Sequence, residues 1–334
     1  SRLFQANSAG YGGGAIASYD GALTVAGSLF AANSAGYWGG GVLVNAGAHA
    51  VGNATFAANS AGYSGGGLAV LNGALTAVNV TFAGNSASIG GAVSNQSGQL
   101  VLRNAIVSES TAGGNCAGAI TNGGANLESS ATCGFGAAVG SHSNVNAMLT
   151  PLGDYGGGTW TYALLPGSPA IDAGDAAVCA AASVGGLDQR GVARPQGAGC
   201  DIGAFESRGF TLILSGSPQQ ALTGGDFAQP LQVTLDNAGG EPVGPGGLVV
   251  FTPPEEGAGI DIYTPFTITT EAGGVVSITA TANELAGSYV VSVTTRGALT
   301  TTAFALTNRV RNLRAGKLGD GVGAIASDPP GIDC

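Results

Sequence analysis

The chain has 334 residues, of which 44% are apolar and only 9% are Asp, Glu, Lys or Arg, against about 25% charged residues in an average soluble protein. Twenty acidic against ten basic residues give a net charge of −10, which provides no electrostatic basis for binding a nucleic-acid backbone or an anionic membrane surface. No apolar run reaches the roughly 18 residues of a membrane span. We therefore expect no nucleic-acid partner and no membrane insertion by this segment.

The N-terminal third is an internal repeat with a period of 26 residues. Three copies read Phe-x-Ala-Asn-Ser-Ala-Gly-Tyr, a fourth begins at Phe82, and a glycine cluster and a short apolar run follow each one. The units contain few helix formers, and stretches such as residues 77–82 alternate as strands do. The period therefore predicts a right-handed parallel β-helix of about 26 residues per coil, with successive coils stacked ~4.8 Å apart.

Stacked coils place equivalent residues above one another, which predicts side-chain ladders. We expect the phenylalanines to stack inside the coils and the asparagines to form an amide ladder at a corner, where asparagine tolerates left-handed turn geometry. We interpret both ladders as scaffold. The phenylalanine ladder is Phe4, Phe30, Phe56 and Phe82, and the asparagine ladder is Asn7, Asn33, Asn59 and Asn85. The candidate residues for stacking against a glycan, near the glycine turns, are Tyr11, Tyr37, Trp38 and Tyr63.

Two families resemble the first two thirds of the chain. The Phe-x-x-Asn and Gly-Gly-Ala-Ile elements of residues 1–120 resemble the repeats of polymorphic outer-membrane proteins, which are adhesins with β-helical passenger domains. The motif Leu-Leu-Pro-Gly-Ser-Pro-Ala-Ile-Asp-Ala-Gly-Asp at 164–175, with 188–195 and 200–206, resembles the choice-of-anchor Q family of bacterial surface proteins. That resemblance covers roughly residues 100–206. It implies a cell-surface location and implies no enzymatic activity.

The sequence changes character after residue 209, where Val- and Thr-rich alternating runs are separated by turn signals, as in an antiparallel sandwich. Residues 227–308 resemble bacterial immunoglobulin-like domains of the invasin and intimin type, which serve as stalk units. The tail is similar to the first strand of a small repeat domain of secreted bacterial proteins. The predicted fold is thus all-β, and we expect a longer parent chain, because residue 1 already lies inside a repeat. The expected segments are a β-helix over 1–140, a helix-capping segment over 141–208, an immunoglobulin-like β-sandwich over 209–308, and a linker with the start of a further domain over 309–334.

Five cysteines form two separated pairs and a leftover. We predict that Cys116 pairs with Cys133 and Cys179 with Cys200, each disulfide stabilising the fold by roughly 3 kcal/mol in an oxidising compartment. The alternative is free buried thiols. Cys334 would pair with a cysteine beyond the present end.

Reactive groups are scarce. Residues 1–102 carry only two charged side chains, Arg2 and Asp20, and one carboxylate cannot form the pair that glycoside hydrolysis needs. Of the two histidines, His49 is expected at the surface or at a corner, and His142 is the other. A charged cluster follows, which we interpret as ion pairs and turn caps that close the bottom of the helix. Its members are Asp154, Asp172, Asp175, Asp188, Asp201, Glu206, Arg190, Arg194 and Arg208. The alternative is a calcium site held by Asp172 and Asp175, and no other cofactor is expected.

These patterns favour a non-catalytic extracellular structural or adhesive surface module, a rigid rod carried on immunoglobulin-like spacers. Its partners would be other copies, neighbouring domains of a longer surface protein, or a glycan. One alternative is a subunit that self-assembles into a filament through unpaired strand edges. The other is a glycan-binding module that uses the aromatic residues near the turns. An enzyme is the least favoured hypothesis.

Overall fold

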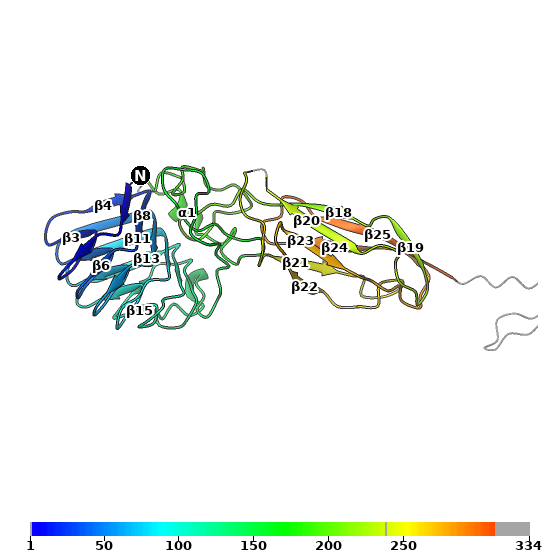
Figure 1. Cartoon of the computed structure of the whole chain (residues 1–334), viewed down its shortest axis with the longest axis horizontal. Coiled ribbons are helices and arrows are strands. Elements are labelled where there is room, and N and C mark those ends of the chain that lie inside the picture. Colours follow the sequence, from blue (N-terminus) through cyan, green and yellow to red (C-terminus); the bar gives the residue numbers. More distant parts are fainter. Residues whose placement is uncertain (1, 183, 238, 311–334) are drawn as a thin grey trace, which may run out of the picture.

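The computed structural model describes residues 2–182, 184–237 and 239–310 (Figure 1). Their regular secondary structure is almost entirely β-strand, and the helices among the described residues are the single turn α1 (Ala176–Cys179) and the 3-10 turn η1 (Ala138–Gly140). The predicted all-β fold class is confirmed.

The N-terminal part is a β-solenoid of about four coils with about 26 residues per coil. Phe4 pairs with Phe30, Phe30 with Phe56 and Phe56 with Phe82, so equivalent residues lie in register. The largest parallel sheet has the order β1-β5-β8-β11-β13-β16 with β4, β14 and β17 attached, and the two smaller sheets have the orders β3-β7-β10-β12-β15 and β2-β6-β9. The strands are β1 (Arg2–Gln5), β2 (Ser8–Ala9), β3 (Ile16–Ser18), β4 (Thr24–Ala26), β5 (Ser28–Ala31), β6 (Ser34–Ala35), β7 (Val42–Val44), β8 (Ala48–Ala57), β9 (Ser60–Ala61), β10 (Leu68–Val70), β11 (Ala74–Ala83), β12 (Val93–Asn95), β13 (Gln99–Arg103), β14 (Ile106–Ser108), β15 (Cys116–Ala117), β16 (Thr121–Asn122) and β17 (Leu127–Glu128).

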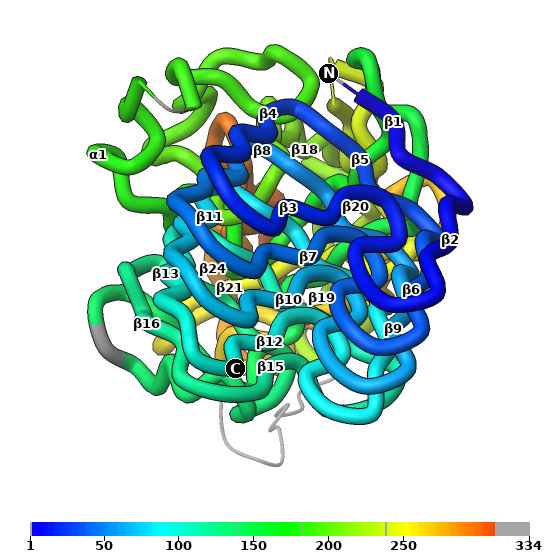
Figure 2. Tube along the Cα trace, turned by 90° about the vertical axis from the view of Figure 1, so that its left-hand side faces the viewer, coloured from blue at the N-terminus to red at the C-terminus, as the bar shows by residue number. Residues whose placement is uncertain are grey.

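The coils stack across the longest axis of the molecule. Figure 1 shows β4 and β8 above β11 and β13, with β15 at the bottom, and the turned view in Figure 2 shows the same order. The side of the solenoid, and not its end, therefore faces the rest of the chain.

The segment that follows the solenoid packs against the outer surface of the largest sheet. Thr55 Oγ1 in β8 donates a hydrogen bond to Gln189 Oε1 (2.7 Å), and Ala204 N donates to Thr81 Oγ1 in β11 (3.0 Å). The predicted location at the bottom of the helix is wrong for this part of the segment, whereas the residues around His142 do pair with the last coil, through a bridge to Leu127. The physical reason is that apolar side chains such as Leu29, Ala31 and Ala57 point outward from β5 and β8, and this segment shields them from water.

Two further sheets form the C-terminal part, and their inward side chains share one core. Alternating burial along β20 shows which face of the strand points inward. The first sheet has the order β18 (Thr211–Ser215), β20 (Leu231–Asp236) and β23 (Val275–Ile278), and the second has the order β19 (Gln219–Leu222), β25 (Thr302–Arg309), β24 (Gly287–Thr294), β21 (Leu248–Thr252) and β22 (Phe266–Thr269).

One strand pair departs from the predicted antiparallel pattern. β19 runs parallel to β25, whereas the other pairs of named strands in these two sheets are antiparallel. The chain leaves β18 in the first sheet and enters the second sheet as β19 after three residues, which explains why β19 lies at an edge beside the last strand. The expected linker and further domain lie outside the described residues beyond residue 310.

A continuous core joins the capping segment to the C-terminal sheets. The same cluster of buried residues contains Leu127 from the last coil, Phe205 from the capping segment and Phe251 from the second sheet. Backbone hydrogen bonds cross the same junction, from Leu248 N to Pro166 O (2.8 Å) and from Gly167 N to Arg296 O (3.1 Å). The parts are therefore fused by packing as well as by the chain.

Candidate functional site

The aromatic residues near the glycine turns form an exposed row, which we name the tyrosine row: Tyr11, Tyr37, Tyr63 and the adjacent Trp38. The tyrosines are 52%, 56% and 44% exposed, and Trp38 is partly buried. Tyr37 N donates to Tyr11 O (2.8 Å) and Tyr63 N donates to Tyr37 O (3.0 Å), so the backbone holds one tyrosine per coil. Burial of these rings would have removed the motive for a glycan-binding hypothesis, and they are not all buried.

The rings of the tyrosine row also contact each other. The ring centroids of Tyr11 and Tyr37 are 5.8 Å apart at a tilt of 36°, and Trp38 meets Tyr63 edge-on at 4.8 Å. The preceding glycine explains how the coils approach so closely, because a Cβ at Gly62 would lie 2.1 Å from Gly36 O. Since neighbouring rings cover part of each other, the row offers ring edges and hydroxyl groups to a ligand more than open ring faces.

The phenylalanine ladder lies inside the coils. Neighbouring ring centroids are 4.7, 4.7 and 4.6 Å apart and nearly parallel, and the three rings from Phe30 onward are fully buried. The ladder is thus part of the core and offers nothing to a ligand.

The asparagine ladder is also internally satisfied, with one difference from expectation. Asn33 Nδ2 donates to Asn59 Oδ1 (2.8 Å), the same bond links the other rungs, and Asn85 Nδ2 ends on Phe56 O (2.8 Å). The left-handed residue is the one before each asparagine, such as Ala32 (φ 52°) or Ala58 (φ 51°). The asparagines of this ladder therefore act through hydrogen bonds and not through left-handed backbone, and each side-chain oxygen also accepts the backbone N–H of the asparagine in the preceding coil.

A second asparagine ladder was not foreseen. Asn53, Asn79 and Asn104 all have left-handed backbone, with φ of 48°, 50° and 48°. Two of them hold the capping segment: Asn53 Nδ2 donates to Val184 O (3.1 Å), and Asn104 Oδ1 accepts from Asp175 N (2.9 Å). Their spacing of 26 and then 25 residues is a signal that the sequence did contain.

Both predicted disulfides are present, Cys116–Cys133 and Cys179–Cys200. The first links β15 to the chain beyond β17, and the second joins α1 to the chain just before Asp201.

The two aspartates proposed for calcium bind backbone amides. Asp172 Oδ1 accepts from Gly199 N (2.8 Å), and Asp175 Oδ1 caps α1 by accepting from Ala177 N (2.8 Å) and Val178 N (3.3 Å). Among the described residues, no group of three or more His, Cys, Asp or Glu side chains could hold a metal ion. The geometry gives these carboxylates a capping role.

The charged cluster is a buried ion-pair network, which we name the junction network. Arg190 Nε lies 2.8 Å from Asp188 Oδ2 and Arg190 Nη1 lies 3.0 Å from Glu241 Oε1, while Arg194 pairs with Glu206 at 2.9 Å; all these side chains are at most 1% exposed. Glu241 lies in the connection between β20 and β21 of the C-terminal part and was not foreseen, because 51 residues separate it from Arg190. The network therefore ties the capping segment to the C-terminal part.

Burial controls the protonation of the junction network. It raises the pKa of Asp201 well above its ordinary value, with repulsion from Glu206 adding to the effect. It also raises the pKa of Glu206 and lowers the pKa of Arg194, although their mutual attraction opposes both shifts. Both oxygens of Asp201 accept backbone N–H groups, from Asp172 (2.8 Å) and Ser207 (2.6 Å). These carboxylates are thus engaged in structure.

The remaining cluster members lie at its edge. Asp154 Oδ1 accepts from Gly156 N (3.0 Å), and Arg208, 37% exposed, lies 3.8 Å from Glu241. Of the histidines, His49 is the second residue of β8 and is 6% exposed, so of the two predicted locations, surface or corner, the surface is wrong. Its Nδ1 accepts from Leu23 N (3.1 Å) and its Nε2 contacts Ala46 O, so both ring nitrogens are used inside the fold. His142 is exposed and only its backbone bridges to the last coil.

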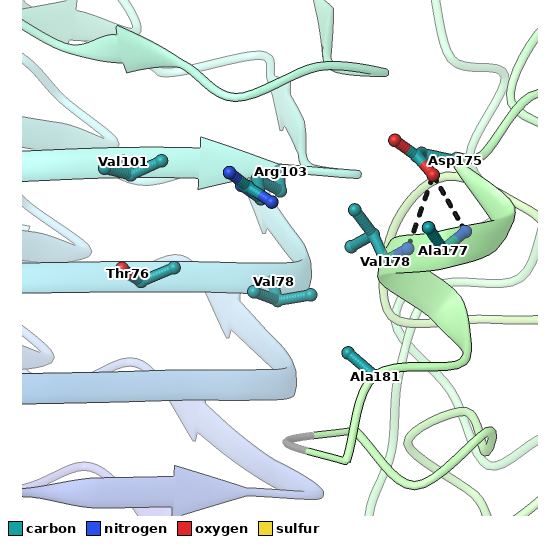
Figure 3. A pocket seen from close by; sticks show the side chains of 8 residues that line it. All are labelled: Thr76, Val78, Val101, Arg103, Asp175, Ala177, Val178 and Ala181. Atoms are coloured by element: carbon teal, nitrogen blue, oxygen red, sulfur yellow. Dashed lines mark hydrogen bonds between the residues drawn. The ribbon is translucent and has the colours of Figure 1, made fainter.

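A groove of about 390 Å³ separates the largest sheet from α1 (Figure 3). Val78 and Val101 form the sheet side, Ala181 lies on the opposite side, and Arg103 and Asp175 lie at one end. None of the ion pairs found among the described residues involves Arg103. The groove's two charged lining residues, Arg103 and Asp175, are opposite in sign, so the lining has no net charge that would favour an ionic ligand.

None of the protein-family models, curated proteins or solved structures compared with this chain matches it. Within the described residues, no helix is long and apolar enough to cross a membrane. The function must therefore be argued from the geometry above.

Proposed function

We propose that this chain is a non-catalytic, extracellular structural and adhesive module of a bacterial surface protein. The observation that carries the proposal is the junction network, together with the continuous core beneath it. A chain with 9% charged residues places fully buried ion pairs where the capping segment meets the C-terminal sheets. Such pairs often add little net stability. We infer that here they fix the geometry of the junction, which is what an arm that holds a surface at a fixed distance requires.

Other features support parts of this proposal. The two disulfides are consistent with an oxidising, extracellular environment. We assign the C-terminal sheets to the immunoglobulin-like type for two reasons. They consist of one three-stranded and one five-stranded sheet, and the first stretch of chain is divided between them, with β18 in the first sheet and β19 in the second. The right-handed coil and the choice-of-anchor Q and polymorphic outer-membrane protein relationships remain part of the same proposal, on the motifs given above.

A second candidate function is glycan binding by the tyrosine row. Its support is that three tyrosines, one per coil, are exposed on the surface of the solenoid, whereas the repeated phenylalanine rings are buried inside it. Substituting Tyr11, Tyr37 and Tyr63 together by serine would remove the rings without disturbing the core.

The test is adhesion of protein-coated beads to immobilised glycans and extracellular-matrix preparations, with the solution mass measured in parallel. Saturable adhesion by a monomer, without release of soluble sugar, is expected. Long fibres would replace the adhesive module by a self-assembling filament, and release of reducing sugar from a polysaccharide would refute the non-catalytic assignment.

A further inference from the structure

A second cavity, of about 310 Å³, lies between the solenoid and a hairpin of the capping segment. The hairpin is defined by antiparallel bridges between Leu149 and Leu164 and between Gly153 and Thr161. Leu152 from this hairpin packs on the outer face of β5 and β8. We name the cavity the Trp160 groove. Its lining is Leu3, Gln5, Leu29, Ala31, Leu152, Gly158, Thr159 and Trp160.

The Trp160 side chain is an exposed ring on a rigid base. It is 53% exposed, whereas its backbone is held from behind by Gln189, which is 2% exposed. Gln189 Nε2 donates to Trp160 O (2.9 Å) and to Thr159 Oγ1 (3.0 Å). Its Oε1 accepts from Thr55 Oγ1 (2.7 Å), which anchors the whole arrangement to β8.

This base is costly to build, because buried amide and hydroxyl groups must each find a partner. The partners found here fix residues 159 and 160 against the solenoid. Because the backbone that carries the ring is fixed in advance, less freedom is lost when a ligand stacks on Trp160, and this preorganisation favours binding.

The lining decides the chemistry of the ligand. It contains no charged side chain, so nothing there compensates the desolvation of a charged group. It combines an indole and three leucines with the amide of Gln5. A ligand with an apolar face and a hydroxylated edge fits this set, and a pyranose ring has that character. The volume is at the lower end for ligand pockets, enough for a short stretch of sugar.

We propose that the Trp160 groove binds the uncharged hexose units of a neutral glycan, which Trp160 recognises by stacking. The proposal rests on the adhesive function above and names its ligand class, and it places the site away from the tyrosine row.

The two tryptophans of the chain allow a direct test. In the Trp38→Phe variant, Trp160 is the sole indole, and titration with neutral oligosaccharides such as cello-, manno- and malto-oligomers should change its fluorescence saturably for at least one series. In the matched Trp160→Phe variant, Trp38 should not respond. By calorimetry, Trp160→Ala should weaken binding about tenfold with an unchanged unfolding midpoint. Leu3→Glu should weaken it as well, since Leu3 is 57% exposed and the change places a carboxylate in the groove.

Several results would overturn the proposal. A response from Trp38 alone would move the site to the tyrosine row. If the groove binds only acidic oligosaccharides, or binds an apolar dye but no sugar, its ligand is not a neutral glycan. If Trp160→Ala leaves bead adhesion unaffected and no sugar changes the Trp160 fluorescence, the Trp160 groove is rejected as the binding site while the adhesive function stands. If the unmodified protein shows neither bead adhesion nor a fluorescence response to any sugar, both proposals are rejected.

Discussion

Removal of Glu241 from the junction network is the sharpest test of the rigid arm. Its side chain is 1% exposed and its carboxylate accepts from Arg190 Nη1 (3.0 Å), from Arg208 N (2.9 Å) and from Asn237 Nδ2 (3.2 Å). Glu241→Ala would leave the Arg190 guanidinium buried, still paired with Asp188 and lying over the Phe205 ring, but with one carboxylate fewer.

The expected loss of stability is large. Breaking a buried ion pair by removing one partner costs about 3–5 kcal/mol, and the backbone and amide donors left without an acceptor add to the penalty. The matched control is Glu256→Ala, the same chemical change at an exposed position in the same part of the chain. That control should stay within about 0.5 kcal/mol of the unmodified protein.

Differential scanning calorimetry provides the assay. Because the core is continuous across the junction, the unmodified protein should unfold in one main transition. Glu241→Ala should lower its midpoint by about 10 °C, taking about 2–4 °C per kcal/mol for a chain of this size, or separate the C-terminal sheets into a transition of their own. If Glu241→Ala behaves like Glu256→Ala in a single transition, the network does not hold the junction together.

Three further predictions follow from the fold. Phe56→Ala should destabilise the solenoid by about 3–5 kcal/mol, because rings cover both faces of Phe56; Phe4→Ala, with a neighbour on one face, should cost clearly less in chemical denaturation, and equal losses would contradict the stacking argument. Since the folded pKa of Asp201 is raised by burial, its stabilising contribution is complete below the unfolded value of about 3.9 and is lost as the pH rises through the folded pKa. Denaturation midpoints should therefore increase when the pH is lowered from 7 to 5, and Asp201→Asn should flatten this dependence; a steeper slope in the variant would show that another group is responsible. Replacing Cys179 and Cys200 by serine should lower the free energy of unfolding by about 3 kcal/mol, for a sequence separation of 21 residues. As a control, chemical reduction of this disulfide in the unmodified protein should lower its stability to that of the variant.

The solenoid could be predicted from the sequence because its order is local. Stacking makes each coil the template for the next, so one period of 26 residues specifies which side chains meet. The phenylalanine ladder, the asparagine bonds and the disulfides between near neighbours follow from that period and from short separations along the chain. The exposed tyrosines obey the same rule, although only the structure shows that their rings partly cover each other.

The tertiary structure decided what depends on contacts between distant residues. No local sequence signal identifies Glu241 as the partner of Arg190, because 51 residues separate them. Likewise, none identifies Gln189 as the residue that anchors Trp160 to Thr55, because Gln189 and Thr55 are 134 residues apart. The same holds for the capping segment, which lies along the side of the solenoid. Its position is set by which apolar surface remains to be covered once the coils have formed, and burial of that surface is a property of the assembled fold and not of any single stretch of sequence.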